Sequence, residues 1–286
     1  MKLKPTTYKK LEFLLTLGFV LTLAGAVGIF SYPHVMNALN DRMVDEILTN
    51  KHVEEKTAEK LSEQMKQRQE VARQKALQDP YSAESLHELS YDPITIPIYA
   101  KHVIGEIYLP TIKHSLPIFD NSSEQFLQRG ATWLATSSDL TGGVGKHSIV
   151  AGHSGIPHAR LFNEVPKLKV GDLILYKIAN EYYAYKIFEQ KKVTPDQSQK
   201  VLLDKNRDLT TLVTCVPIGI NSHRLLITGE RVPFTPTMMK EIENIQQEKK
   251  KTDTRIFLLL GSGCVLLIIV LFLVIRNYRK GRGERK

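Results

Sequence analysis

Two uncharged apolar runs are the strongest pattern in the chain. Residues 13–30 and 256–275 contain no charged side chain over 18 and 20 positions. A helix of about 20 apolar residues can cross the ~30 Å hydrocarbon core of a bilayer. We therefore predict a transmembrane helix or signal anchor at 13–30 and a transmembrane helix at 256–275. The short sequence Ala24-Gly25-Ala26 leaves cleavage of the first run as an alternative.

The segment after the first run has a helical pattern. Residues 34–79 contain no glycine or proline and are rich in Glu, Lys, Gln, Arg, Ala and Met. Apolar residues recur at helical spacing at Val35, Leu39, Met43 and Ile47. The apolar face thins out after Leu48, which predicts a solvated or loosely packed spacer helix in the later half, up to Gln78. We assign 31–78 as an extracytoplasmic helical segment.

The middle of the chain changes to a β pattern. Residues 79–98 contain Asp79-Pro80-Tyr81 and Asp92-Pro93, which disfavour helix and predict a loop. Short strand-like runs follow at 103–109, 148–151, 173–178, 182–193, 210–215 and 225–228. We predict one mostly β domain at 99–235 and a polar helical stalk at 236–255.

Net charge is concentrated at the two ends. Of the formal charge of +9, residues 1–12 contribute +3 and residues 276–286 contribute +5. A nucleic-acid-binding surface needs its basic residues on a folded face, so no nucleic-acid partner is expected. Basic residues outside each apolar run instead predict cytoplasmic termini by the positive-inside bias. The chain is expected in the cell membrane, with its middle domain outside the cell.

Cysteine usage gives the first indication of chemistry. Cys264 lies within the second apolar run, so Cys215 is the sole thiol of the predicted exported part. No internal disulfide is possible there. A lone thiol in an oxidising compartment indicates a reactive residue or a small buried apolar one, and both interpretations stay open at this point.

Two further residues could act with such a thiol. His153 follows an apolar run and is flanked by glycines, and Arg224 lies nine residues after Cys215 across a predicted strand-joining loop. The general alternatives are a structural histidine and a surface ion pair. His147, His153 and His158 form no plausible metal set without thiolates or carboxylates, so no metal and no cofactor is expected.

These residues resemble a known family. Thr211-Leu212-Val213-Thr214-Cys215, followed by Asn221-Ser222-His223-Arg224-Leu225-Leu226, is similar to the cysteine and arginine motifs of sortases. Gly152-His153-Ser154-Gly155 resembles their catalytic-histidine segment, and the similarity extends from about Gly105 to Arg231. The resemblance implies a mostly β fold, the sortase-type eight-stranded β-barrel with an N-terminal helix and lid. It also implies catalytic roles for His153, Cys215 and Arg224.

Two features resemble the pilus-building class C sortases. One is the second transmembrane helix, and the other is Asp79-Pro80-Tyr81, which is similar to the lid motif of that class. In that motif Asp79 would meet Arg224 and Tyr81 would cover Cys215. Asp92-Pro93-Ile94 is a rival position without the aromatic ring. Val216 and Ile218 differ from the Thr and Tyr that many class C sequences carry after the cysteine.

The resemblance implies a cysteine transpeptidase. It would cleave a Leu-Pro-x-Thr-Gly-like sorting signal between Thr and Gly, and join the acyl group to a lysine of another pilin. The first alternative is a sortase that anchors surface proteins to a peptidoglycan precursor. The alternative from another class is a non-catalytic membrane-tethered adhesion or scaffold protein. A papain-like protease is disfavoured because the histidine precedes the cysteine.

Overall fold

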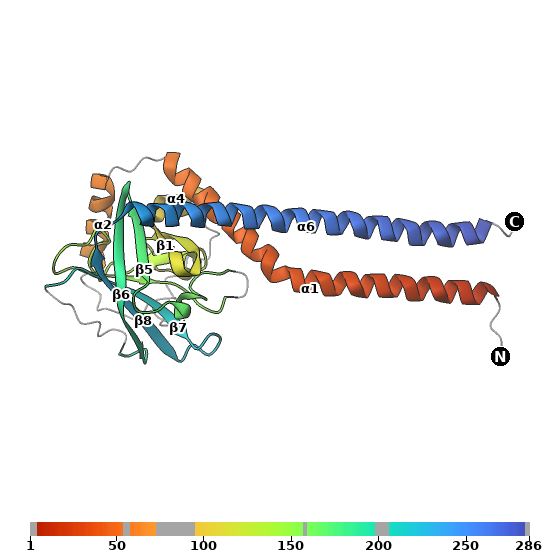
Figure 1. Ribbon diagram of the computed structural model, residues 1–286, viewed down its shortest axis with the longest axis horizontal. Helices are drawn as coiled ribbons and strands as arrows, with labels where there is room; N and C mark the ends of the chain where they lie inside the picture. The colour runs from red at the N-terminus through yellow and green to blue at the C-terminus, as the bar shows by residue number, and fades with distance from the viewer. Residues whose placement is uncertain (1–4, 54–57, 73–94, 157–158, 198–205, 284–286) are drawn as a thin grey trace. The chain divides into compact units, whose positions relative to one another are not determined.

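The computed structural model describes residues 5–53, 58–72, 95–156, 159–197 and 206–283 of the 286-residue chain (Figure 1). Two compact units are present: residues 39–248, and residues 1–38 with 249–286. The elements in chain order are α1 (Pro5–Val53), α2 (Ala58–Ala72), α4 (Ile96–His102), β1 (Val103–Leu109), η1 (Pro110–Ile112), β2 (His114–Phe119), α5 (Glu124–Leu127), β3 (Ala131–Trp133), β4 (His147–Ala151), η2 (Val165–Lys167), β5 (Leu173–Ile178), β6 (Glu181–Val193), β7 (Leu209–Val216), β8 (His223–Val232) and α6 (Pro236–Gly283).

Eight strands of the larger unit close into a barrel (Figure 1). Their order around the barrel is β1-β2-β3-β4-β7-β8-β6-β5. The β2–β3 and β4–β7 pairs are parallel and the other pairs are antiparallel. Because closure removes free strand edges, the barrel needs no further covering of its edges. The predicted fold class is confirmed.

Side chains of the same strands alternate between two hydrophobic clusters. Trp133, Val150, Leu212 and Ile227 belong to the central core. A smaller cluster on the opposite face of the same strands contains Leu134, Ile149, Ala151, Val213 and Leu226. Since successive side chains of a strand point to opposite faces, residues in step with Val213 and Leu226 point away from the central core. We call this smaller cluster the outer cluster.

The strand predictions are largely confirmed. Six of the strands fall where the apolar runs predict them, and β1 and β5 have the predicted bounds, 103–109 and 173–178. Strands β2 and β3 were not predicted. β2 contains Pro117, which argues against a strand in sequence, and β3 is only three residues long. The barrel closes through this pair.

The prediction of a solvated or loosely packed spacer helix after Leu48 is wrong for α2. Leu61 and Met65, four residues apart, are almost fully buried in the central core. The polar residues beside them are also engaged, since Gln64 Nε2 and Arg68 Nε donate to Asp120 Oδ2 at 2.6 and 3.2 Å. The helix is too polar overall for its two apolar residues to reveal this from sequence. It packs against the barrel.

Helix α4 was not predicted: its first three residues fall in the predicted loop 79–98 and the rest in the predicted β domain 99–235. It begins at Ile96, at the end of the predicted loop 79–98, and Pro97 occupies its first turn. Proline is tolerated there because the first-turn N–H groups have no partner within the helix. Proline therefore marked the start of this helix.

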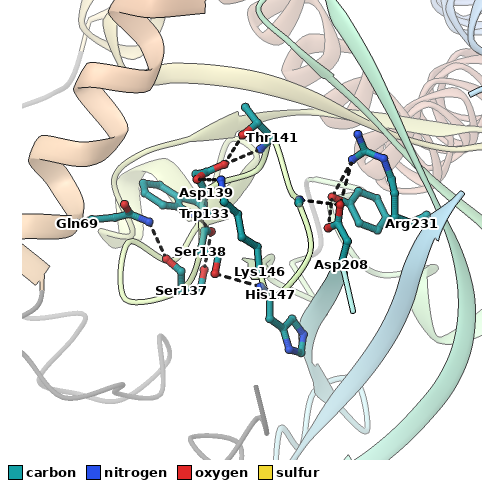
Figure 2. A network of polar contacts seen from close by, with 12 residues as sticks. Gln69, Trp133, Ser137, Ser138, Asp139, Thr141, Lys146, His147, Asp208 and Arg231 are labelled. Carbon is teal, nitrogen blue, oxygen red and sulfur yellow. Dashed lines mark hydrogen bonds and ion pairs between the residues drawn. The ribbon is translucent and has the colours of Figure 1, made fainter. Parts of the chain in front are cut away.

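Polar contacts hold the long β3–β4 connection (Figure 2). Lys146 Nζ lies 2.7 Å from Asp139 Oδ2, and Gly143 N donates to Asp208 Oδ2 at 2.7 Å. Gly142 and Gly143 adopt positive φ angles of 73° and 129°, a conformation that glycine adopts at no steric cost. These contacts have a structural role, because they join residues within the β3–β4 connection or bond the connection to the barrel.

The smaller unit contains the two apolar runs. Both lie in helices long and apolar enough to cross a membrane, within Leu11–Thr49 and Pro236–Arg279, and their apolar windows are unburied. Phe13 and Tyr278 stack with ring centroids 4.2 Å apart. Exposed apolar side chains on this scale are costly in water and favourable in a bilayer. These features support membrane anchoring.

Candidate active site

Cys215 and Arg224 lie directly opposite each other on neighbouring strands. They are Cα partners in the antiparallel β7–β8 ladder, one residue before the end of β7 and one after the start of β8. Opposite residues of such a pair have Cβ atoms about 4.5–5.5 Å apart on the same face. Cys215 is in step with Val213 and Arg224 with Leu226, so both belong to the outer-cluster face. The β7–β8 connection thus returns a guanidinium beside the thiol.

Both side chains are shielded from water. Cys215 is 5% exposed and Arg224 is 6% exposed. Arg224 Nη1 donates to the backbone carbonyl of Asn221 at 3.0 Å, which fixes the guanidinium toward the loop. Asn221 itself has a φ of 57°, a conformation that asparagine adopts more readily than most residues. Ile218 and Ile220 of the same loop are exposed.

His153 comes from the strand on the other side of β7. β4 pairs with β7 in parallel, and Ala151 is the Cα partner of Val213. His153 lies two residues beyond Ala151, just as Cys215 lies two residues beyond Val213. The imidazole and the thiol are therefore carried at the same end of adjacent strands.

Three hydrogen bonds connect the histidine segment to the cysteine strand. Gly152 N donates to Val213 O at 3.1 Å, and Thr214 Oγ1 donates to Gly152 O at 2.8 Å. Ser154 Oγ donates to Cys215 O at 2.5 Å and is buried. No sequence pattern assigned a separate role to Ser154 or Thr214. Their bonds fix the backbone on both sides of His153 relative to Cys215.

The chain after His153 folds back on it. Phe162 N donates to His153 O at 2.9 Å, and Gly155 N donates to Asn163 Oδ1 at 2.6 Å. A Cβ added at Gly152 would lie 2.6 Å from the ring of Phe162, which is fully buried. Glycine at 152 is therefore required by close packing. The glycine that flanks the histidine has a steric cause.

The imidazole has an acidic partner that sequence analysis missed. His153 Nε2 lies 2.9 Å from Glu124 Oε2, and these side chains are 13% and 25% exposed. The hydrogen bond from His153 is the largest cause of a lowered pKa at Glu124, opposed by burial and assisted by Gln128. Glu124 lies 29 residues before His153 on the short helix α5, and no local pattern linked the two.

The other sequence hypotheses have plain outcomes. His147 Nε2 lies 2.7 Å from Thr211 Oγ1, and His158 lies outside the described residues. Within the described parts of the chain, no three His, Cys, Asp or Glu side chains are grouped to hold a metal ion. Asp79, Pro80 and Tyr81 also lie outside those parts, so the lid stays a prediction.

A thiol, an imidazole and a guanidinium thus share one end of the barrel. The sortase domain model matches residues 107–232, which contain all three. A solved sortase C1 of Streptococcus agalactiae is 34% identical, with a TM-score of 0.52, over 63% of this chain and 90% of that chain. The chain belongs to the sortase family.

Further similarities point to the pilus-related sortases. A pilus-related sortase C of group B Streptococcus is 33% identical with a TM-score of 0.51, over 63% of this sortase and 93% of that chain. The class C resemblance is therefore confirmed by solved structures. A sortase A of Bacillus anthracis is 36% identical over 46% of this chain. The alignment spans 61% of that curated relative's length.

Proposed function

We propose that this sortase is a membrane-anchored cysteine transpeptidase that polymerises pilins, with Cys215 as nucleophile, His153 as general acid and base, and Arg224 as oxyanion donor. The observation that carries the proposal is the position of the three residues at one end of adjacent strands β4, β7 and β8. No cofactor is required for this acyl transfer.

The first half-reaction forms a thioacyl enzyme. The thiol proton of Cys215 passes to His153, and the resulting thiolate attacks the threonine carbonyl of a Leu-Pro-x-Thr-Gly-like signal, so that the carbonyl oxygen becomes an oxyanion. Arg224 donates to that oxygen, a contribution of about 3–4 kcal/mol for a well-placed donor. His153 then gives a proton to the departing glycine amine as the carbon–nitrogen bond breaks.

The second half-reaction releases the enzyme. A lysine amine of another pilin attacks the thioester carbonyl, His153 accepts the amine proton, and the Cys215 sulfur leaves. The product is an isopeptide bond. Burial of Cys215 and Arg224 supports this chemistry, because charge interactions are stronger where water is excluded.

Membrane anchoring agrees with this function. Two helices suited to spanning a bilayer lie on either side of the barrel in sequence. We propose that both termini are cytoplasmic and that the barrel faces outward, where exported pilins arrive. Residues 1–12 and 276–286 are the expected cytoplasmic tails, because they contain most of the net positive charge.

A peptidoglycan precursor is the alternative acceptor. The chain is similar to a sortase A of Bacillus anthracis as well as to solved sortases C, so this acceptor is tested beside the pilin. The decisive experiment mixes the detergent-solubilised chain with candidate pilins and, separately, with a lipid-linked precursor, and identifies the products by mass spectrometry. An isopeptide-linked pilin dimer is the expected product. Exclusive transfer to the precursor would replace pilus polymerisation by cell-wall anchoring.

A non-catalytic scaffold is the alternative from another class. It predicts that Cys215 neither accumulates an acyl group nor reacts preferentially with alkylating reagents. The same mixtures separate the two cases, because a scaffold would yield no covalent product with either acceptor.

A further inference from the structure

We propose that Glu124 is a positioning residue that bonds Nε2 of His153, and that Nδ1 is the ring atom that exchanges protons with the substrate. The inference rests on the proposed transpeptidase function and extends it to a fourth residue. Glu124 Oε2 lies 2.9 Å from His153 Nε2. A carboxylate accepts but does not donate a hydrogen bond, so the proton between these atoms belongs to Nε2.

The carboxylate is itself held in place. Gln128 Nε2 donates to Glu124 Oε1 at 2.9 Å, so each carboxylate oxygen has one partner among the described residues. Glu124 and Gln128 are four residues apart, the spacing that places side chains together on a helical turn. The buried Phe126 and Leu127 anchor that turn to the protein. The arrangement therefore restricts Glu124 before any substrate arrives.

The His153–Glu124 pair is charged and partly shielded from solvent. The side chain of His153 is 13% exposed and that of Glu124 is 25% exposed. The hydrogen bond from His153 holds the pKa of Glu124 below its usual range, so the carboxylate is ionised at neutral pH. A charged acceptor strengthens the hydrogen bond and favours one orientation of the ring. Glu124 acts on the reaction through the imidazole.

This orientation assigns the proton transfers to named atoms. During acylation Nδ1–H gives its proton to the glycine amine, and the ring keeps Nε2–H bonded to Glu124. During resolution Nδ1 takes a proton from the attacking lysine amine, and the imidazolium then has both protons. One proton leaves Nδ1 and one returns in each cycle, and Glu124 stays a carboxylate throughout.

Variants of Glu124 separate its effect on His153 from the general effect of removing a carboxylate charge. Glu124→Gln keeps the shape but removes the charge, and Glu124→Asp keeps the charge on a shorter side chain. The matched control is Glu230→Gln. Glu230 is also a paired carboxylate, bonded to Arg207, but it lies opposite Leu209 at the end of the β7–β8 ladder away from Cys215.

Kinetics with a sorting-signal peptide and an amine give the first readout. We expect Glu124→Gln to lower kcat by roughly 10- to 100-fold, part of the 10²- to 10⁴-fold that general acid–base catalysis supplies. KM should change little, the pH profile of kcat should shift, and Glu124→Asp should recover part of the rate. Glu230→Gln should match the wild type. Unchanged kcat and pH profile in a folded Glu124→Gln variant would overturn the proposal.

Nuclear magnetic resonance on the wild type gives the second readout. The full chain, labelled with ¹⁵N-histidine in detergent micelles, is titrated until the ring of His153 is neutral, with the signal assigned by a His153→Gln variant. The Nε2–H tautomer is expected, and the Nδ1–H tautomer would contradict the proposal. This test needs no acyl transfer. An Nε2–H ring in a chain that forms no thioacyl intermediate would support the pairing while refuting the transpeptidase function.

Discussion

Cys215 and Arg224 are Cα partners across the β7–β8 ladder, and both are almost completely buried. The ladder register therefore sets the thiol beside the guanidinium, with only a six-residue loop between the strands. Placement on rigid strands preorganises an oxyanion donor more accurately than placement on a loop. The predictions below follow from this pair and from the contacts that align His153 with it.

Replacing Arg224 should affect the chemical step. We expect Arg224→Ala to lower kcat by about 10²- to 10³-fold, the usual cost of losing one oxyanion donor. Arg224→Lys should recover a part of this, because it keeps the charge but loses the planar fork. Steady-state transpeptidation with a peptide and an amine measures both. Arg207→Ala, which removes an arginine paired with Glu230, is the control and should leave kcat unchanged. Near-normal turnover by Arg224→Ala would refute the assigned role.

Enlarging Gly152 should displace the histidine segment. A Cβ at this position meets the buried Phe162 ring at 2.6 Å, so Gly152→Ala should destabilise the fold by about 1–3 kcal/mol and reduce activity. Phe162→Leu in the same chain removes ring atoms from the clash and should restore part of both. Urea unfolding and peptide turnover are the measurements. A double variant no better than Gly152→Ala would show that the clash is not the cause.

The sequence predicted the strands of the candidate site better than the side-chain contacts around them. The apolar run 148–151 and the motif ending at Cys215 identified two of the site's strands, because buried strands have a strong local pattern. Glu124 and Ser154 were missed, since their contacts join segments 29 and 61 residues apart. Helix α2 was misjudged for a related reason. Its Gln and Arg residues appear solvated in sequence, but they bond to the buried Asp120.

Two side-chain hydroxyls should align His153 with Cys215. Ser154→Ala and Thr214→Val each leave a backbone carbonyl without its hydroxyl partner, which should cost about 1–3 kcal/mol of unfolding free energy. Each should also lower kcat, because small displacements of reacting groups reduce the rate strongly. The control is Ser148→Ala, which removes a buried hydroxyl bond to Thr210 elsewhere on β4. It should lose similar stability but keep kcat. Equal kcat losses in all three variants would refute the alignment role.

Acid should weaken the attachment of α2. Burial raises the pKa of Asp120, but hydrogen bonds from His102 and Gln64 and the charges of His102 and Arg68 outweigh it, so the pKa lies below its usual range. A lowered pKa contributes stability that is present above the unfolded value of about 4 and is lost as the pH falls through the folded value. Asp120→Asn should therefore be less stable than wild type at pH 7.

The difference in unfolding free energy between the wild type and Asp120→Asn should shrink on acidification. Urea unfolding at pH 7 and near pH 3 measures it, with Asp172→Asn as a control on the turn before β5, where Asp172 Oδ2 accepts a hydrogen bond from Lys169 N. A difference that stays constant across this range would show that ionised Asp120 does not stabilise the docked helix.

The most direct test of the central claim is intact-mass spectrometry of the enzyme after incubation with a Leu-Pro-x-Thr-Gly peptide in the absence of an acceptor amine. The account predicts a mass increase equal to the peptide acyl fragment ending at threonine, located on Cys215 by proteolytic mapping and absent from Cys215→Ala. Added amine should discharge it into product. Product formation by Cys215→Ala, or an acyl group located on another residue, would contradict the account.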